Sequence, residues 1–176
     1  MAGPFSGYRI IDVTNVIAGP LATMILADQG ADVIKVEGPR RLDHTRVAGF
    51  SQNGLTAAFL NNNRNKRSVS IDLKSEQGCS ILKRLVATAD VFIQNFRPGV
   101  VDRLGIGEPE LRRIRDNIIY VSMSGWGEDG PLSHKPVYDP IIQALSGLAT
   151  VQAGSDEERP RLVRTILPDK VTGITA

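Results

Sequence analysis

Carboxylates and cations are the side chains of this 176-residue chain whose placement suggests chemistry. Asp169 stands between an apolar run and the start of a helical pattern. Its carboxylate is ionised near neutral pH and could attack an acyl group. The same position also suits a helix N-cap, and the pattern alone favours that structural role.

Basic residues recur near the ends of predicted strands, where each is either a solvated surface charge or part of a site for a phosphate-rich ligand. They are Arg40, Arg64, Lys66, Arg67, Lys74, Arg97, Arg103 and Lys135. Arg97 and Arg103 flank a turn and a helix start, which together form a good environment for an anion. Phe96 either stacks on a purine or packs into the core, and the pattern leaves both alternatives open.

Three other chemistries fit the sequence poorly. Glu37 lies where a ribose-binding acid would follow a dinucleotide turn, but the turn at Gly19 lacks the G-x-G-x-x-G fingerprint. The two histidines, His44 and His134, lie in different loops without the spacing of metal ligands, so we expect no metal site. Ser124 is preceded two positions earlier by a serine, so the G-x-S-x-G turn of a serine hydrolase is absent.

The elements that must position these side chains begin with residues 9–37, which read as strand, turn, helix, turn, strand. Pro20 suits the first turn of the helix, and Gly30 suits its end. Two apolar strands joined by such a helix predict a right-handed βαβ unit in a parallel sheet. Ligands bind at the carboxyl ends of such strands, so residues 15–20 are the first candidate site.

The rest of the chain continues to alternate strands and helices, which predicts an α/β fold with a Rossmann-like, doubly wound, mainly parallel sheet. Further strands are predicted at 68–73, 91–96 and 118–123, with a sixth at 162–167. Helices are predicted at 75–89, where Ser75 is the expected N-cap, at 109–116 and at 138–148.

Composition excludes several classes of protein. The chain is 41% hydrophobic and 23% charged, ordinary values for a globular domain. Its net charge of +2 is too small to indicate a nucleic-acid partner. No apolar run approaches the roughly 20 residues of a membrane span, and no signal peptide is evident. A single cysteine, Cys79, fits a reducing compartment, so we expect a cytoplasmic protein without a membrane partner.

Short motifs follow one another in a specific order. They are Asp12-Val13-Thr14, Ala18-Gly19-Pro20, residues 30–37, Asn65-Lys66-Arg67-Ser68, Asp72-Leu73-Lys74, residues 95–99, Arg103-Leu104-Gly105, residues 124–127, Gly130-Pro131, Tyr138-Asp139 and Ser146-Gly147. This series resembles the class III CoA-transferase family, which includes formyl-CoA transferase, carnitine CoA-transferase and α-methylacyl-CoA racemase. Each motif is weak alone, but the ordered series covers nearly the whole chain.

The resemblance implies a fold, a nucleophile and a partner. The large domain of the family is Rossmann-like, and two full-length chains interlock as a homodimer. By position the family's nucleophilic aspartate is Asp169, which reverses the preference drawn from the pattern alone. Acyl-CoA and a small carboxylic acid are the implied substrates, and no permanently bound cofactor, ATP or metal is required. We also expect residues 1–176 to be the N-terminal part of the CoA-binding large domain, inactive without the remaining domain.

The resemblance also carries over a set of CoA contacts. They are Ile17, Ala18, Arg40, Ile71, Asp72, Leu73, Lys74, Asn95, Phe96, Arg97, Arg103, Lys135, Val137, Tyr138 and Asp139. Ile17 stands where the formyl-type transferases carry glutamine, and Arg40 would replace an arginine that the family has directly after Glu37. Racemases of the family use a histidine where this chain has Tyr138, so transfer is favoured over racemisation. A non-catalytic CoA-binding module is the remaining alternative.

Overall fold

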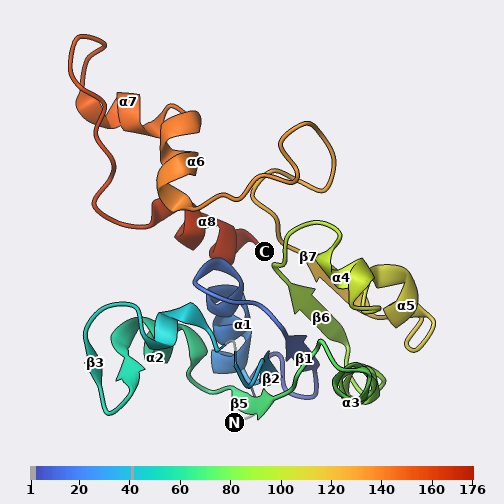
Figure 1. The fold of residues 1–176 in the computed structure, drawn as a ribbon. Helices are drawn as coiled ribbons and strands as arrows, with labels where there is room; N and C mark the ends of the chain where they lie inside the picture. Colours follow the sequence, from blue (N-terminus) through green and yellow to red (C-terminus); the bar gives the residue numbers. More distant parts are fainter. Residues whose placement is uncertain (1–2, 41) are drawn as a thin grey trace.

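The chain, described by a computed structural model over residues 3–40 and 42–176, is built on a five-stranded sheet (Figure 1). Its strands are β1 (Arg9–Asp12), β2 (Asp32–Glu37), β5 (Arg67–Ser70), β6 (Val91–Gln94) and β7 (Ile119–Ser122). They lie in the order β5-β2-β1-β6-β7, and every neighbouring pair is parallel. The predicted parallel sheet is therefore confirmed.

Helices cover both faces of this sheet. α1 (Ala18–Asp28) packs on one face through a cluster of small apolar residues that includes Ala22 and Ala27. The opposite face carries α3 (Glu76–Val86), α4 (Val100–Arg103) and α5 (Glu108–Arg112), which bury a larger cluster around Leu82 and Phe92. This arrangement is the predicted doubly wound fold.

Two smaller groups of elements flank the sheet. Between β2 and β5 lie a 3₁₀ turn (His44–Arg46), β3 (Ser51–Gln52), β4 (Leu55–Thr56) and α2 (Ala57–Asn63). After β7 come α6 (Asp139–Leu145), α7 (Leu148–Ala153) and α8 (Leu167–Thr175). Figure 1 shows α6 and α7 projecting away from the sheet and α8 returning to α1. Within the described residues, no helix has the length and apolar character needed to cross a membrane.

Close packing of α8 on α1 depends on Gly173. A Cβ at this position would stand 2.7 Å from the carbonyl oxygen of Ala18 and 3.0 Å from Leu21 Cδ2. Because glycine has no side chain, the two helices approach more closely than any larger residue would allow. This contact brings the first turn of α8, which contains Asp169, toward the start of α1.

The sixth strand predicted at 162–167 is wrong. Residues 161–166 have no regular structure, and α8 already begins at Leu167. The backbone here bonds to the α6–α7 arm instead of a strand: Val163 N–H donates to Gln143 Oε1 at 2.8 Å, and Arg161 N–H to the Ala149 carbonyl at 2.9 Å. The helix predicted at 138–148 is also split, because Gly147 takes a φ of 79° between α6 and α7.

Two neighbouring residues of α3 provide a test of the packing in the larger apolar core. Leu82 of α3 is fully buried in the larger core cluster, whereas its neighbour Ile81 is 39% exposed. We expect Leu82→Ala to lower the free energy of unfolding by about 2–5 kcal/mol, through lost burial and a cavity. Ile81→Ala, the matched control, should change it by about 1 kcal/mol or less. Urea unfolding followed by circular dichroism checks both, and equal losses would contradict the packing described.

Candidate functional site

A cavity of about 390 Å³ opens at the carboxyl end of the sheet, where β1 separates β2 from β6. We call it the switch cavity, because the chain reverses its direction across the sheet at β1, and parallel sheets bind ligands at such points. Its walls come from the turn after β1, the segments after β6 and β7, the start of α6 and the first turn of α8. The first candidate site predicted from sequence, residues 15–20, supplies one wall.

The switch cavity brings together ten of the sixteen predicted site residues. They are Ile17, Ala18, Asn95, Phe96, Arg97, Lys135, Val137, Tyr138, Asp139 and Asp169. Three others, Leu73, Lys74 and Arg103, line a separate groove beside α3. Ile71 is 4% exposed within the core, whereas Asp72 and Arg40 are exposed and line neither hollow.

Asp169 lies within the first turn of α8 and lines the cavity opposite the start of α1. Ile166 occupies the N-cap position, so the N-cap role weighed for Asp169 is wrong. Its backbone N–H donates to Asp139 Oδ2 at 3.2 Å. Burial, together with the charge of Asp139, raises the pKa of the Asp169 carboxyl above its ordinary value.

The turn that faces Asp169 is held in a strained shape. Asn15 and Asn95 exchange two hydrogen bonds of 2.9 and 2.8 Å, which tie the end of β1 to the end of β6. Val16 has a φ of 73°, an unfavourable conformation for a β-branched residue. Its N–H donates to Asp43 Oδ1 at 3.2 Å, which helps to hold the turn. Ile17 and Ala18 follow directly and enter the cavity wall.

Beneath this turn lies a buried ionic network that the sequence did not reveal. Lys66 Nζ donates to Asp12 Oδ2 at 3.0 Å, to the Pro20 carbonyl at 2.8 Å and to an asparagine of α2. Lys35 Nζ donates to Asp43 Oδ2 at 3.0 Å and to the Thr14 carbonyl at 2.9 Å. The two lysine side chains are each only 2% exposed. The network therefore joins β1, β2, α1 and α2 directly under the cavity.

Both members of the Lys66–Asp12 pair are ionised at neutral pH. Burial lowers the pKa of Lys66 to about 8, with the nearby Asp12 charge opposing that effect. Burial alone would raise the pKa of Asp12, but the Lys66 and Lys35 cations and the hydroxyls of Thr14 and Thr23 outweigh it and lower that pKa. A carboxylate this deep is stable only while its cations stay in place.

Ion pairs also change the interpretation of the basic residues that the sequence places near strand ends. Lys66 is buried against Asp12, Arg64 pairs with Asp28, and Arg67 pairs with Asp32 at 2.9 Å. These three cations are therefore structural. No ion pair within residues 3–40 and 42–176 involves the other predicted cations, which are Arg40, Lys74, Arg97, Arg103 and Lys135.

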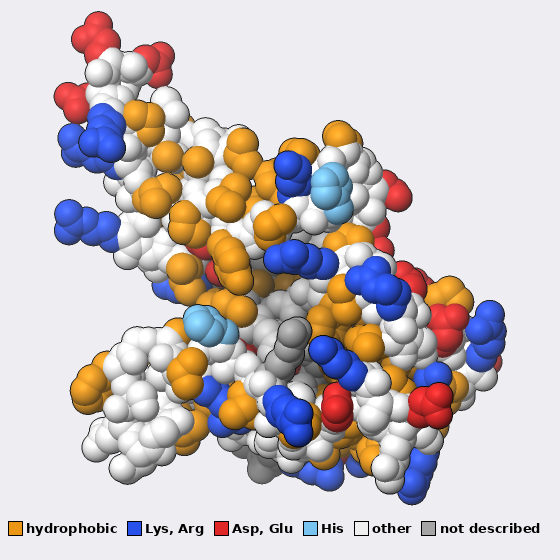
Figure 2. All heavy atoms as spheres, viewed as in Figure 1, with side chains coloured by type: hydrophobic (Ala, Val, Ile, Leu, Met, Phe, Trp, Pro, Cys, Tyr) orange, Lys and Arg blue, Asp and Glu red, His pale blue; other side chains and the backbone are white. Residues whose placement is uncertain are grey.

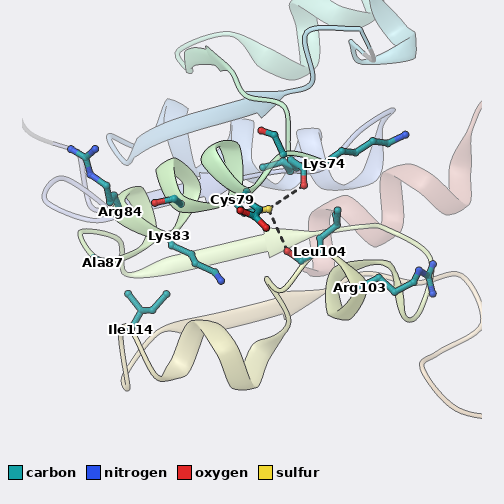
Figure 3. A pocket seen from close by; sticks show the side chains of 12 residues that line it. Lys74, Cys79, Lys83, Arg84, Ala87, Arg103, Leu104 and Ile114 are labelled. Atoms are coloured by element: carbon teal, nitrogen blue, oxygen red, sulfur yellow. Dashed lines mark hydrogen bonds between the residues drawn. The ribbon is translucent and has the colours of Figure 1, made fainter.

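A second hollow, the α3 groove, lies between α3 and the α4–α5 segment and has a volume of about 620 Å³. Lys74, Lys83, Arg84 and Arg103 line it, with Glu76 as the acidic residue among its walls. Figure 3 shows Lys74 and Arg103 extending to the side away from Arg84. The groove is therefore basic and suited to an anionic ligand.

Cys79 lies at the floor of the α3 groove but is a poor nucleophile. Its thiol donates to the carbonyls of Leu73 and Leu104 at 3.1 and 3.3 Å, as Figure 3 shows. Burial raises its pKa, so the protonated form is favoured. Cys79 is only partly buried.

The α3 groove continues toward the switch cavity. Arg103 Nη1 lies 3.1 Å from the place where a Cβ on Gly99 would stand, and Arg97 and Pro98 line the cavity on the other side of the same turn. Phe96 meets both alternatives raised by the sequence, since it lines the cavity and also packs against the larger core cluster. A ligand long enough to follow the 96–99 turn could therefore occupy both hollows.

Apolar side chains gather on the arm that projects beyond the switch cavity (Figure 2). Leu145 on α6, Val151 on α7 and Ile174 on α8 are 63%, 79% and 70% exposed. So large an apolar surface is typical of a surface that another polypeptide segment covers.

The fold and site define a Rossmann-like α/β domain whose ligand cavity lies at the switch point and carries a single half-buried carboxylate in α8. The sequence model of CoA-transferase family III matches residues 5–176. The chain belongs to CoA-transferase family III.

Known relatives agree with this assignment. A succinyl-CoA:glutarate CoA-transferase of Mus musculus is 43% identical over 176 residues, which cover 98% of this chain and 40% of the relative. An acetyl-CoA:oxalate CoA-transferase of Acetobacter aceti is 43% identical over 172 residues, covering 98% and 44%. The crystal structure of a CAIB/BAIF family protein from Brucella suis superimposes with a TM-score of 0.92 at 35% identity, covering 99% and 47%. The chain thus spans less than half the length of these relatives.

The Lys66–Asp12 pair and the exposed Arg64–Asp28 pair provide a matched test of the buried network. We expect Lys66→Met to lower the free energy of unfolding by roughly 3–5 kcal/mol, because Asp12 would stay buried without this cation. Arg64→Met breaks an ion pair whose arginine side chain is 52% exposed, and should cost about 1 kcal/mol or less. Chemical unfolding at pH 7 measures both, and a loss for Lys66→Met no larger than the control would contradict the assignment.

Proposed function

We propose that this chain forms the CoA-binding part of an enzyme that transfers coenzyme A from an acyl-CoA donor to a small carboxylic acid. The observation that carries the proposal is the path from the Asp169 carboxylate, through the switch cavity and past the 96–99 turn, to the basic α3 groove. Coenzyme A has a thiol at one end and phosphates at the other, so its two ends match the two ends of this path.

The nucleotide end of the ligand is assigned to cations that form no ion pair within the described part of the chain. Lys74, Arg97 and Arg103 would hold its phosphates through charge-assisted hydrogen bonds, and Phe96 would stack on the adenine. Lys135, Val137 and Tyr138 would follow the pantetheine along the loop that leads to α6. Ile71 is too deeply buried to offer more than its backbone, and Asp72 and Arg40 would act at the rim of the site.

The acyl end of the ligand is assigned to Asp169. Its carboxylate attacks the thioester carbonyl, the C–S bond breaks, and the CoA thiolate leaves with the electron pair, giving a mixed anhydride. The thiolate then attacks the aspartyl carbonyl, which releases the donor acid and leaves an aspartyl-CoA thioester. The acceptor carboxylate attacks this thioester, and the thiolate returns to the new acyl group and regenerates Asp169.

This exchange replaces one thioester by another, so the energy of the bond is conserved and no nucleotide triphosphate is consumed. Partial burial of Asp169 assists the attack, because a carboxylate with few waters loses less solvation on reacting. The names of the relatives, which pair a CoA donor with glutarate or oxalate, support a small carboxylic acid as acceptor.

We further propose a cytoplasmic homodimer for the full-length protein. The exposed apolar side chains of α6, α7 and α8 support a second polypeptide surface on this arm. Racemisation of the acyl-CoA is the competing activity within the fold. Tyr138 is 66% exposed at the cavity in the position of the racemase base, and an ordinary tyrosine is a weak base for removing an α-proton.

Trapping of the covalent intermediate tests the role of Asp169. The protein at its full natural length is incubated with succinyl-CoA and hydroxylamine, and modified peptides are located by mass spectrometry. We expect a hydroxamate at Asp169, because both the anhydride and the thioester react with hydroxylamine. Asp169→Ala should abolish trapping, while Asp156→Ala, which removes an exposed carboxylate remote from the cavity, should leave it unchanged.

Two outcomes would count against the transferase assignment. Transfer that survives in Asp169→Ala would remove the aspartate from the mechanism. Exchange of the α-proton with deuterated water, without any acyl transfer, would favour the racemase.

Binding of CoA tests the assignment of the phosphate contacts. We expect Arg103→Ala to weaken CoA binding by about 1–3 kcal/mol, because a charge-assisted contact to phosphate is lost. Arg84→Ala is the matched control, since it removes an exposed arginine from the other end of the same groove (Figure 3). Isothermal titration with CoA measures both, and equal effects would show that the groove acts only through its net charge.

A further inference from the structure

Two buried polar residues of α6, Asp139 and Gln143, form a chain of hydrogen bonds that joins α6 to the segment leading into α8. They are 5% and 2% exposed and lie one helical turn apart. Gln143 Nε2 donates to Asp139 Oδ1 at 2.6 Å and to the Thr165 carbonyl at 3.1 Å. Gln143 Oε1 accepts from Val163 N–H at 2.8 Å, and Asp139 Oδ2 accepts from Asp169 N–H at 3.2 Å.

We propose that Asp139 and Gln143 are a positioning pair that fixes the Asp169 carboxylate within the switch cavity for acyl transfer. The proposal rests on the proposed function, in which Asp169 is the nucleophile. It replaces the CoA contact that the family resemblance implies for Asp139, because this residue is 5% exposed and both of its carboxylate oxygens are bonded to protein groups. It also assigns a role to Gln143, which the sequence did not single out.

The local backbone explains why such a pair is needed. The segment from Arg161 to Ile166 forms no helix or strand of its own, and it leads directly into α8. Gln143 holds this segment at two backbone groups, and Asp139 holds the first turn of α8 at a third. Reacting groups must be held closely in place for efficient transfer, and a displacement of about 1 Å can cost two orders of magnitude in rate.

The bonding pattern has a fixed direction. The carboxylate of Asp139 can only accept, so Gln143 must present its NH₂ group to Asp139 and its oxygen to Val163. Asp139→Asn can turn one amide NH₂ toward the NH₂ of Gln143, a contact between two donors. Gln143→Glu instead sets a carboxylate against Asp139. The double variant Asp139→Asn/Gln143→Glu restores a donor facing an acceptor and keeps the backbone bonds to Asp169 and Val163. It gives up the bond to the Thr165 carbonyl, because a carboxylate cannot donate, so recovery should be incomplete.

Charge gives the pair a second, measurable effect on Asp169. The start of α1 places only Ile17 and Ala18 beside the cavity and brings no charge. α6 contributes the Asp139 carboxylate and the Tyr138 phenol, while Arg97 and Lys135 line the cavity from the segments after β6 and β7. On α8 itself the next residue, Lys170, is exposed and donates to Thr165 Oγ1. Burial raises the pKa of Asp169 and the charge of Asp139 raises it further, so removal of that charge should lower the pKa.

The experiment compares wild type, the two single variants and the double variant at full natural length. The rate of hydroxamate formation at Asp169 is measured with succinyl-CoA and hydroxylamine between pH 4 and 8, and the affinity for CoA is measured separately. We expect each single variant to trap roughly 100-fold more slowly, with CoA affinity within about twofold of wild type. The double variant should recover to within about tenfold of wild type.

The pH profile separates positioning from simple destabilisation. Protonation of hydroxylamine contributes to the acid limb of the trapping rate equally in every variant, so a shift of that limb between variants reports the protonation of Asp169. In Asp139→Asn the limb should lie at lower pH than in wild type, because a neighbouring negative charge is gone. A purely structural loss would lower the rate equally at every pH. A double variant no better than the single ones, or single variants that trap like wild type, would overturn the positioning role.

The remaining outcomes are equally decisive. A loss of CoA affinity in step with the loss of trapping would make Asp139 a CoA contact and overturn the pair. Absence of trapping at Asp169 in the wild type would overturn the proposed function, and the positioning role with it. Wild-type trapping with unchanged variants would overturn the pair alone.

Discussion

The burial of two lysines beneath one turn is the constraint on which the rest of the site depends. Lys66 and Lys35 bond to Asp12, Asp43 and backbone carbonyls, and so join four elements at the carboxyl end of β1. A buried charge without its partner is strongly destabilising, so these elements can meet in only one arrangement. That arrangement holds the strained Val16 turn and sets where α1 begins.

The position of Asp169, the proposed nucleophile, follows from that turn through helix packing. α8 lies on α1 at the distance that Gly173 allows, and α6 holds the entry to α8 through Gln143 and Asp139. The Asp169 carboxylate is thus placed by two independent contacts, one apolar and one polar. Rigid supporting elements of this kind allow a reactive group in the first turn of a helix to be placed accurately, although the segment before that helix is irregular.

In the proposed function, the two hollows bind different parts of one extended ligand. The α3 groove is open and basic, so it suits phosphates that keep part of their hydration. The switch cavity combines apolar and backbone groups with the carboxylates of Asp169 and Asp139 and the cations of Arg97 and Lys135, so charge developing there is felt strongly. The 96–99 turn, with Arg97 on one side and Arg103 on the other, connects the two environments.

The sequence by itself determined the order of elements, the parallel sheet, the Ser75 cap of α3 and the family, because apolar periodicity, capping residues and ordered motifs are local signals. Only the tertiary structure decided that Lys66 is buried rather than solvated, that residues 162–167 form no strand, and that Gln143 bonds to the backbone of Val163. The physical reason is that the partners of these groups lie 20 to 54 positions away in the chain, as from Gln143 to Val163 and from Asp12 to Lys66. No local pattern records which distant donor will meet a given acceptor, whereas burial of an apolar face is recorded in the spacing of neighbouring residues.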